Sequence, residues 1–144
     1  MSNQNYDQVD TLVAEGSLKW EQDQIVALLV QNATFNRAHK TLGELGAKYL
    51  TSAPINGRWV GEGGMGMGQP AVFQKVNLGE EFQVLVAKDE GRGDPLVLAF
   101  LDVDNEGNPI TVVRTGSLII RPSQENMPSG TVEPPPTTGF WLKL

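Results

Sequence analysis

The chain has 144 residues, 40% of them hydrophobic and 19% charged, which is the composition of one ordinary globular domain. Its formal net charge of −6, without a basic cluster, argues against nucleic-acid binding, and the lack of cysteine excludes disulfides and thiolate metal sites. Sixteen glycines and nine prolines indicate many turns, so we expect a mainly β protein stabilised by packing or oligomerisation.

Neither a targeting segment nor a membrane segment is predicted. The first ten residues have no basic start and no apolar run, and no span approaches eighteen consecutive apolar residues. We therefore expect a soluble protein that is made in a cytoplasm and has no membrane partner.

Residues 1–16 are polar with few large apolar side chains, and we interpret them as an N-terminal arm that need not pack on its own domain. Such an arm is either disordered or laid on a neighbouring molecule. In the second case its contact residues would be Tyr6, Val9, Leu12 and Val13. The rest of the chain, 17–144, is expected to form a single β domain.

The apolar stretch "QIVALLVQ" at 24–31 fits either a buried strand or a buried helix, because it is too short for periodicity to decide. The β-branched Ile25, Val26 and Val30 and the turn-like "NATF" after them favour a strand. Alternation of Leu18 and Trp20 before the stretch points the same way.

One short helix is predicted after residue 40. Thr41 and Glu44 have the spacing of a capping box, and Leu42, Leu45 and Leu50 could form one apolar stripe. Glycines at 43 and 46 limit the helix to two or three turns.

From residue 48 onward the pattern is typical of strands. Asn56-Gly57 suits a tight hairpin turn, and short β-rich runs at 70–78, 80–89, 95–104, 108–114 and 116–123 follow, each bounded by turn residues. These runs predict an antiparallel β-sandwich or barrel, jelly-roll-like, with one short helix. The run at 95–103 is apolar on both faces, so we expect it in the middle of a sheet.

A Pro-rich loop is predicted at 122–139, where Pro134, Pro135 and Pro136 should form an extended, exposed polyproline segment. The final "FWLKL" returns to strand character. We expect it to dock back into the sheet, with Trp141 as an anchor.

Gly61, Gly63 and Gly66 have the G-x-G-x-x-G spacing of dinucleotide-binding loops. In those loops a helix follows and its N-terminus holds the pyrophosphate, whereas here Gln69-Pro70 and a β-rich run follow. We therefore predict no nucleotide cofactor, and interpret the segment as a flexible loop whose Met65 and Met67 contact a partner surface.

Other motifs have ordinary explanations. Residues 102–107 begin like a calcium-binding loop, but Val113 stands where the bidentate glutamate should be, so a hairpin turn without metal is favoured. An Arg-Gly-Asp tripeptide at 92–94 is interpreted as a turn. His39 is the single histidine and no G-x-S-x-G elbow occurs, so we predict no catalytic residues and no enzyme activity.

Four blocks resemble a family of small virion proteins of tailed bacteriophages. The matching residues are Trp20, Asp23, Ile25, Ala27, Leu28 and Leu29 in the first block, His39, Leu42 and Leu45 in the second, Asp94, Pro95, Leu96, Ala99 and Asp102 in the third, and 139–144 in the last. The arm, the Gly-Met segment and the Pro-rich loop depart from the family's pattern.

The resemblance implies a capsid cement or head decoration protein on the outer surface of the capsid. Its partners would be the major capsid protein and further copies of itself, as a homotrimer or homodimer. Two alternatives stay open, namely another virion position at the tail, neck or baseplate, and a β-sandwich module that binds host glycans through Trp59.

Overall fold

The computed structural model describes residues 4–61, 64–69, 71–74, 81–91, 93–102, 110–111, 117–121, 130–131 and 139–143. The helices are α1 (Gln8–Ala14) and the 3-10 helix η1 (Leu42–Leu45). The strands are β1 (Gln4–Asn5), β2 (Ile25–Gln31), β3 (Lys48–Pro54), β4 (Trp59–Gly61), β5 (Met65–Gly68), β6 (Ala71–Gln74), β7 (Glu81–Lys88), β8 (Leu96–Leu101), β9 (Ile110–Thr111), β10 (Ser117–Arg121), β11 (Gly130–Thr131) and β12 (Gly139–Lys143).

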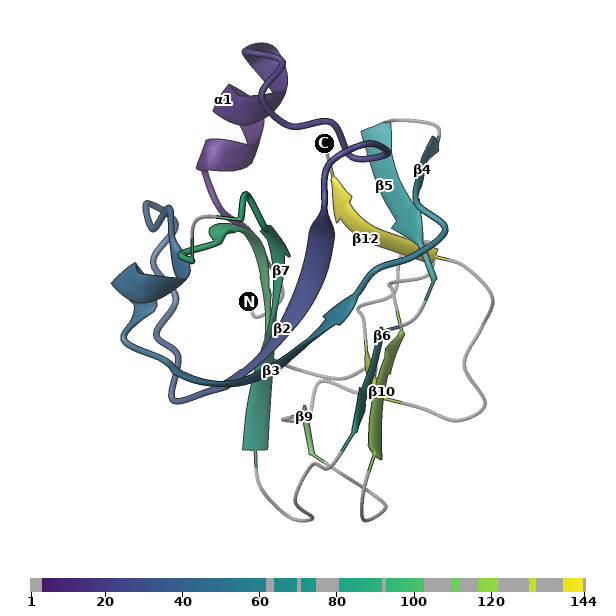
Figure 1. Cartoon of the computed structure of the whole chain (residues 1–144). Helices are drawn as coiled ribbons and strands as arrows, with labels where there is room; N and C mark the ends of the chain where they lie inside the picture. The colour runs from purple at the N-terminus through teal and green to yellow at the C-terminus, as the bar shows by residue number, and fades with distance from the viewer. Residues whose placement is uncertain are drawn as a thin grey trace.

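The fold is mainly β and antiparallel, as predicted, and it has one α-helix. The main sheet has the order β1-β8-β7-β2-β3, and β9 pairs with β7. Two smaller sheets have the orders β11-β10-β6 and β12-β5-β4. Among the described residues the strands form open sheets in a sandwich-like arrangement rather than a closed barrel (Figure 1).

Strand β2 lies between β7 and β3 and is apolar on both faces because both faces of the main sheet are covered. On one face Ile25, Ala27 and Leu29 belong to a first core. On the other face Val26, Leu28 and Val30 belong to a second core. The prediction of a strand from the β-branched residues of this stretch is confirmed.

The two cores are closed by different parts of the chain. The first is completed by α1, by the segment before β2 and by β6, through Val9, Leu18, Trp20, Ala71 and Phe73. The second is completed by the segment 33–47, through Ala33, Phe35, Leu42, Leu45 and Ala47. In Figure 1 the small sheets lie to the right of the main sheet and this segment lies to the left.

Strand β8 was expected inside a sheet, and it does lie between β1 and β7. A β-bulge interrupts its pairing with β7, because Val86 pairs with Ala99 while the next residue, Ala87, pairs with Val97. Leu98 is the extra residue, and the bulge brings both Leu98 and Ala99 into the first core.

The interpretation of residues 1–16 as an arm that need not pack on its own domain is wrong for the described residues. Gln4 and Asn5 pair with β8, and the Tyr6 N–H donates to the Leu98 carbonyl at 2.9 Å. Tyr6 and Val9 are each only 1% exposed. The Tyr6 ring lies 5.0 Å from that of Phe35, so this segment is a structural part of the domain.

The helix expected after residue 40 is a single 3-10 turn, η1. Gly46 ends it in the left-handed conformation at φ +63°, and β3 begins two residues later. The local signal was real, since the Glu44 carboxylate accepts hydrogen bonds from the backbone N–H groups of Thr41 (3.0 Å) and Lys40 (2.6 Å). These bonds, with Lys40 contributing most, lower the pKa of Glu44.

Asn56-Gly57 does form a turn, but the expected hairpin is wrong. Gly57 has a φ of +61°, as the dipeptide suggested. However, β3 pairs with β2 and β4 pairs with β5, so the turn carries the chain from the main sheet to a smaller one.

Several predicted features lie outside the described residues. They are most of the Pro-rich loop at 122–139, including Pro134, Pro135 and Pro136, the calcium-like loop at 103–109 with Val113, and Arg92 and Gly63. The backbone of 139–143 forms β12, as expected for the closing strand, and pairs with β5.

Candidate interaction surface

The described ones among the predicted contact residues lie in two segments, 6–13 and β5. Tyr6, before α1, and Val9, on α1, are core residues, so their prediction as contact residues is wrong. Leu12 packs half-buried against the first core, and Val13 is exposed. Met65 and Met67 do not lie on a loop, because they belong to β5, the central strand of its sheet. Both are half-buried.

Most of the exposed large apolar side chains of the described residues lie at the edge of a sheet. They are Val13, Tyr49, Trp59, Val60 and Val72, between 39% and 49% exposed. All except Val13 lie on the last strand of a sheet, namely β3, β4 or β6. Edge strands that expose apolar side chains are a template for pairing with another chain, so proteins usually avoid them.

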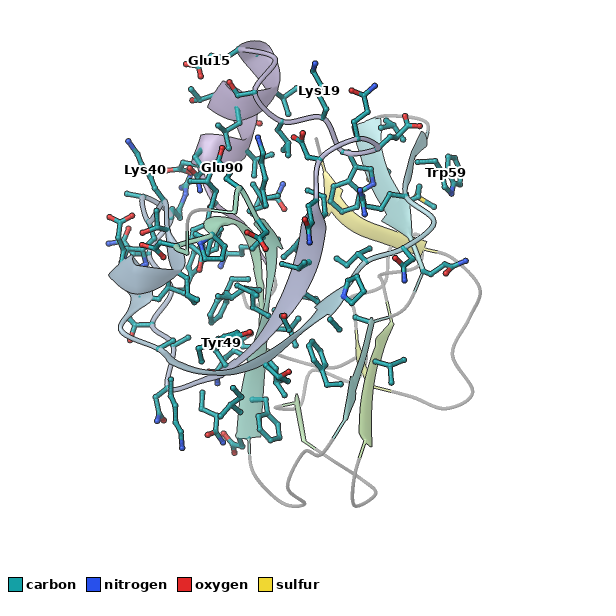
Figure 2. The ribbon with its side chains drawn as sticks, in the orientation of Figure 1. Glu15, Lys19, Lys40, Tyr49, Trp59 and Glu90 are labelled. Atoms are coloured by element: carbon teal, nitrogen blue, oxygen red, sulfur yellow. The ribbon has the colours of Figure 1, made fainter. Side chains whose placement is uncertain are left out.

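Two of these residues, Trp59 and Val60, are adjacent on β4. In the β4–β5 hairpin Trp59 pairs with Met67, Val60 with Gly66, and Gly61 with Met65. Because cross-strand partners share a face, Trp59 and the two methionines lie on one face and Val60 lies on the other. Figure 2 shows Trp59 projecting outward from β4.

The indole of Trp59 leans along its own strand. A Cβ atom added to Gly61 would lie 3.2 Å from Met67 Cγ and 3.4 Å from Trp59 Cζ3. Gly61 therefore provides the space over which the ring and the thioether lie. Of the glycines that suggested a phosphate-binding loop here, Gly61 ends β4 and Gly66 lies inside β5.

The hairpin is held to the body of the domain by two side chains. The Trp20 Nε1–H donates to the Met67 carbonyl at 2.8 Å. The Arg58 guanidinium donates to the backbone carbonyls of Trp20 (2.7 Å), Ile55 (2.6 Å) and Asp23. Burial of this guanidinium lowers the pKa of Arg58, and the Asp23 carboxylate acts in the opposite direction.

The outer edge of β4 is open in the part of the chain that the structure describes. There β4 is the last strand of its sheet, and its residues make backbone hydrogen bonds to β5 alone. The hairpin thus combines an open edge, apolar side chains on both faces and a rigid base. Sequence reasoning named Trp59 only for a glycan site and missed Val60, since neither edge position nor face is visible without the topology.

A groove of about 570 Å³ between α1 and the segment 38–41 is a second candidate site. Gln8 spans it, because its Nε2 donates to the carbonyls of Lys40 and Val97. Asp7 at its rim is already paired with Arg37 at 3.0 Å. Its other lining residues are Thr11, Leu12, Glu15, Ala38, Thr41 and Leu96. This mixed lining favours no particular ligand charge.

Charged groups elsewhere serve structure. Lys88 Nζ donates to the Ser17 carbonyl at 2.7 Å and lies 3.4 Å and 3.6 Å from carboxylate oxygens of Asp23 and Glu90. No group of three or more His, Asp or Glu side chains that could hold a metal ion occurs among the described residues. His39 is half-buried, and its Nδ1 has no hydrogen-bond partner there.

Comparison of the chain with protein-family models, with curated proteins and with solved structures finds no match. Within the described residues, helices long and apolar enough to cross a membrane are also lacking. The resemblance to phage virion proteins therefore stays a prediction based on the sequence motifs.

Proposed function

We propose that this chain is a non-enzymatic structural protein of a tailed-phage virion, most specifically a cement or decoration protein on the outside of the head. In this role it binds across neighbouring subunits of the major capsid protein and associates with further copies of itself. Its contribution is contact area, which needs no catalytic group.

The observation that carries the proposal is the position of the exposed apolar side chains. Tyr49, Trp59, Val60 and Val72 lie on the end strands of three different sheets. A protein that bridges several subunits needs more than one line of contact, and apolar side chains exposed on edge strands provide that contact area. The sandwich-like fold holds these edges on a packed core.

The charge supports an outward position on the shell. At −6, the chain is repelled by packaged DNA and is kept in solution on a surface that faces water. The resemblance of the four sequence blocks supplies the assignment to a virion rather than to another assembly.

A mass-spectrometric inventory of purified particles tests the virion role. We expect the protein in many copies per particle, and its absence would refute the proposal. Cryo-electron microscopy then locates it: density on the head agrees with a cement protein, while density confined to the tail, neck or baseplate favours the alternative position.

One observation supports a second candidate, a module that binds host glycans. Trp59 is 45% exposed, as stacking of an indole on a sugar ring requires. A glycan array gives the test, with Trp59→Ala as the variant that loses stacking and Val72→Ala as the matched exposed control. A signal that disappears only in Trp59→Ala favours this function, and no signal for the wild type excludes it.

A further inference from the structure

We propose that β4 is the surface through which two copies of this chain join. Their β4 strands pair antiparallel about a two-fold axis that passes through Val60, and the two three-stranded sheets become one continuous sheet. This inference deepens the self-association in the proposed function and names the strand that carries it.

The open edge of β4 is the first support. Trp59 and Val60 are exposed on opposite faces of the same three-residue strand, and β4 has no described neighbour beyond β5. A second copy of the strand would satisfy the outward backbone groups and cover both side chains at once. Water would satisfy the backbone groups without covering the side chains. An unrelated side chain would cover an apolar residue without pairing with the backbone groups.

The sequence of β4 is self-complementary in this register. A two-fold axis at Val60 places Val60 opposite Val60 of the second copy, and Trp59 opposite Gly61 of the second copy. Because each indole already leans over its own Gly61, the two rings would lie side by side across the axis, each backed by Met67. A larger residue at 61 would block this arrangement, and pairing of an aromatic residue with an edge glycine is favourable.

Charge and sequence favour this edge over that of β3. Each copy carries −6, so a self-contact must bring few charges together. Trp59, Val60 and Gly61 carry no charge, and the Arg58 guanidinium before them donates to backbone carbonyls. By contrast β3 begins with Lys48 and ends with Pro54, two residue types that protect strand edges from pairing.

The size of the contact sets its strength. A three-residue edge buries less than the roughly 1,000 Å² typical of stable interfaces, so the pairing is weak between free molecules. Copies held next to one another on an ordered shell face a much higher effective concentration, and there the same contact becomes significant.

Cysteine cross-linking tests the register directly, because the natural chain has no cysteine. Directly opposed residues of an antiparallel pair have Cα atoms about 4.5–5.5 Å apart, within the range of about 4.4–6.8 Å that a disulfide spans. We expect Val60→Cys to form a covalent dimer under mild oxidation at least about tenfold faster than Val72→Cys or Tyr49→Cys, since pairing raises the effective thiol concentration. These controls have similar exposure on other edge strands.

Sedimentation velocity of the unmodified chain gives a second readout. The weight-average mass should rise with concentration for the wild type and for Val72→Lys. For Val60→Lys it should stay at the value of the monomer. The proposal is overturned if Val60→Cys cross-links no faster than both controls, or if the wild type stays monomeric at the highest soluble concentration. Failure here leaves shell binding by single copies untouched, whereas the particle inventory tests that role separately.

Discussion

The indole nitrogen of Trp20 donates a hydrogen bond to the carbonyl of Met67 at 2.8 Å, so a side chain of the first core holds β5, the inner strand of the exposed hairpin. Trp20 itself is only 2% exposed. The contact joins residues 47 positions apart and belongs to a small set of bonds that fix the β4–β5 hairpin to the segments beside the main sheet. Trp20 therefore both packs in the first core and holds the hairpin that carries the exposed apolar residues.

Trp20→Phe should separate the hydrogen bond from the apolar packing. The variant leaves the Met67 carbonyl without its donor, so we expect a loss of about 1–3 kcal/mol in the free energy of unfolding, measured by chemical denaturation. Hydrogen exchange should rise most at the amides of β4 and β5. Trp59→Phe, which removes an exposed indole N–H, should change stability by less than about 0.5 kcal/mol. Equal effects of the two variants would contradict the role assigned to Trp20.

Tyr6 should be essential for folding through its ring and not through its hydroxyl. Tyr6→Ala removes a fully buried aromatic side chain and should cost about 3–5 kcal/mol. Tyr6→Phe should be neutral or stabilising, because Tyr6 Oη is buried without a hydrogen-bond partner in the described structure. Deleting residues 1–15 should accordingly lower the melting temperature markedly. An unchanged melting temperature would restore the interpretation of this segment as a separate arm.

The same tyrosine predicts a dependence on alkaline pH. Burial raises the pKa of Tyr6 above its ordinary value of 10.0, so the folded state keeps the phenolic proton where the unfolded state loses it. The contribution of Tyr6 to stability is therefore constant below pH 10 and falls as the pH rises above that value. Tyr6→Phe should remove this part of the loss, as seen in denaturation curves at pH 8 and pH 11. A parallel loss in both proteins would assign the effect to other groups.

Glu44 should contribute stability at neutral pH that is lost in acid. Its pKa is lowered by hydrogen bonds from the backbone N–H groups of Lys40 and then Thr41. A lowered folded pKa means that the contribution is present above the ordinary value of 4.5 and disappears as the pH falls through the folded pKa. Glu44→Gln should therefore be less stable than the wild type at pH 7 and indistinguishable from it at pH 2. A difference that persists at pH 2 would point to a packing role.

Local sequence signals predicted the local backbone conformation well, but they did not predict which strands pair with one another. The β-branched residues of β2 identified a strand, and Asn56-Gly57 identified a turn with positive φ, because both signals act on the backbone of a few residues. Which strands meet at that turn depends on the whole topology. Tyr6 and Val9 were missed as core residues because two apolar side chains in a polar segment do not show that the segment pairs with β8.

The candidate surface was predicted only in outline for the same reason. Met65 and Met67 were expected on a flexible loop, and the structure places them in a paired strand beside Trp59. Val60 gave no signal in the sequence, since its importance comes from its place on an edge strand. Composition could indicate that the protein acts through contacts with other molecules. Only the sheet order indicates which strand edges are open for such contacts.

Arg58 provides the strictest test of a rigid hairpin base. Its guanidinium satisfies backbone carbonyls of Trp20, Ile55 and Asp23, so Arg58→Met would leave these acceptors without a donor. Hydrogen bonds to charged groups contribute about 1.5–3 kcal/mol, and we expect a loss of free energy of unfolding in that range by chemical denaturation.

Arg37→Met is the matched control, because its ion pair with Asp7 is exposed and should contribute less than about 1 kcal/mol. If Arg58→Met also slows the cross-linking of Val60→Cys while Arg37→Met does not, the rigid base is needed to present β4. Equal stability of the two methionine variants would show that the hairpin does not depend on Arg58, and Trp20 would then be its main attachment to the core.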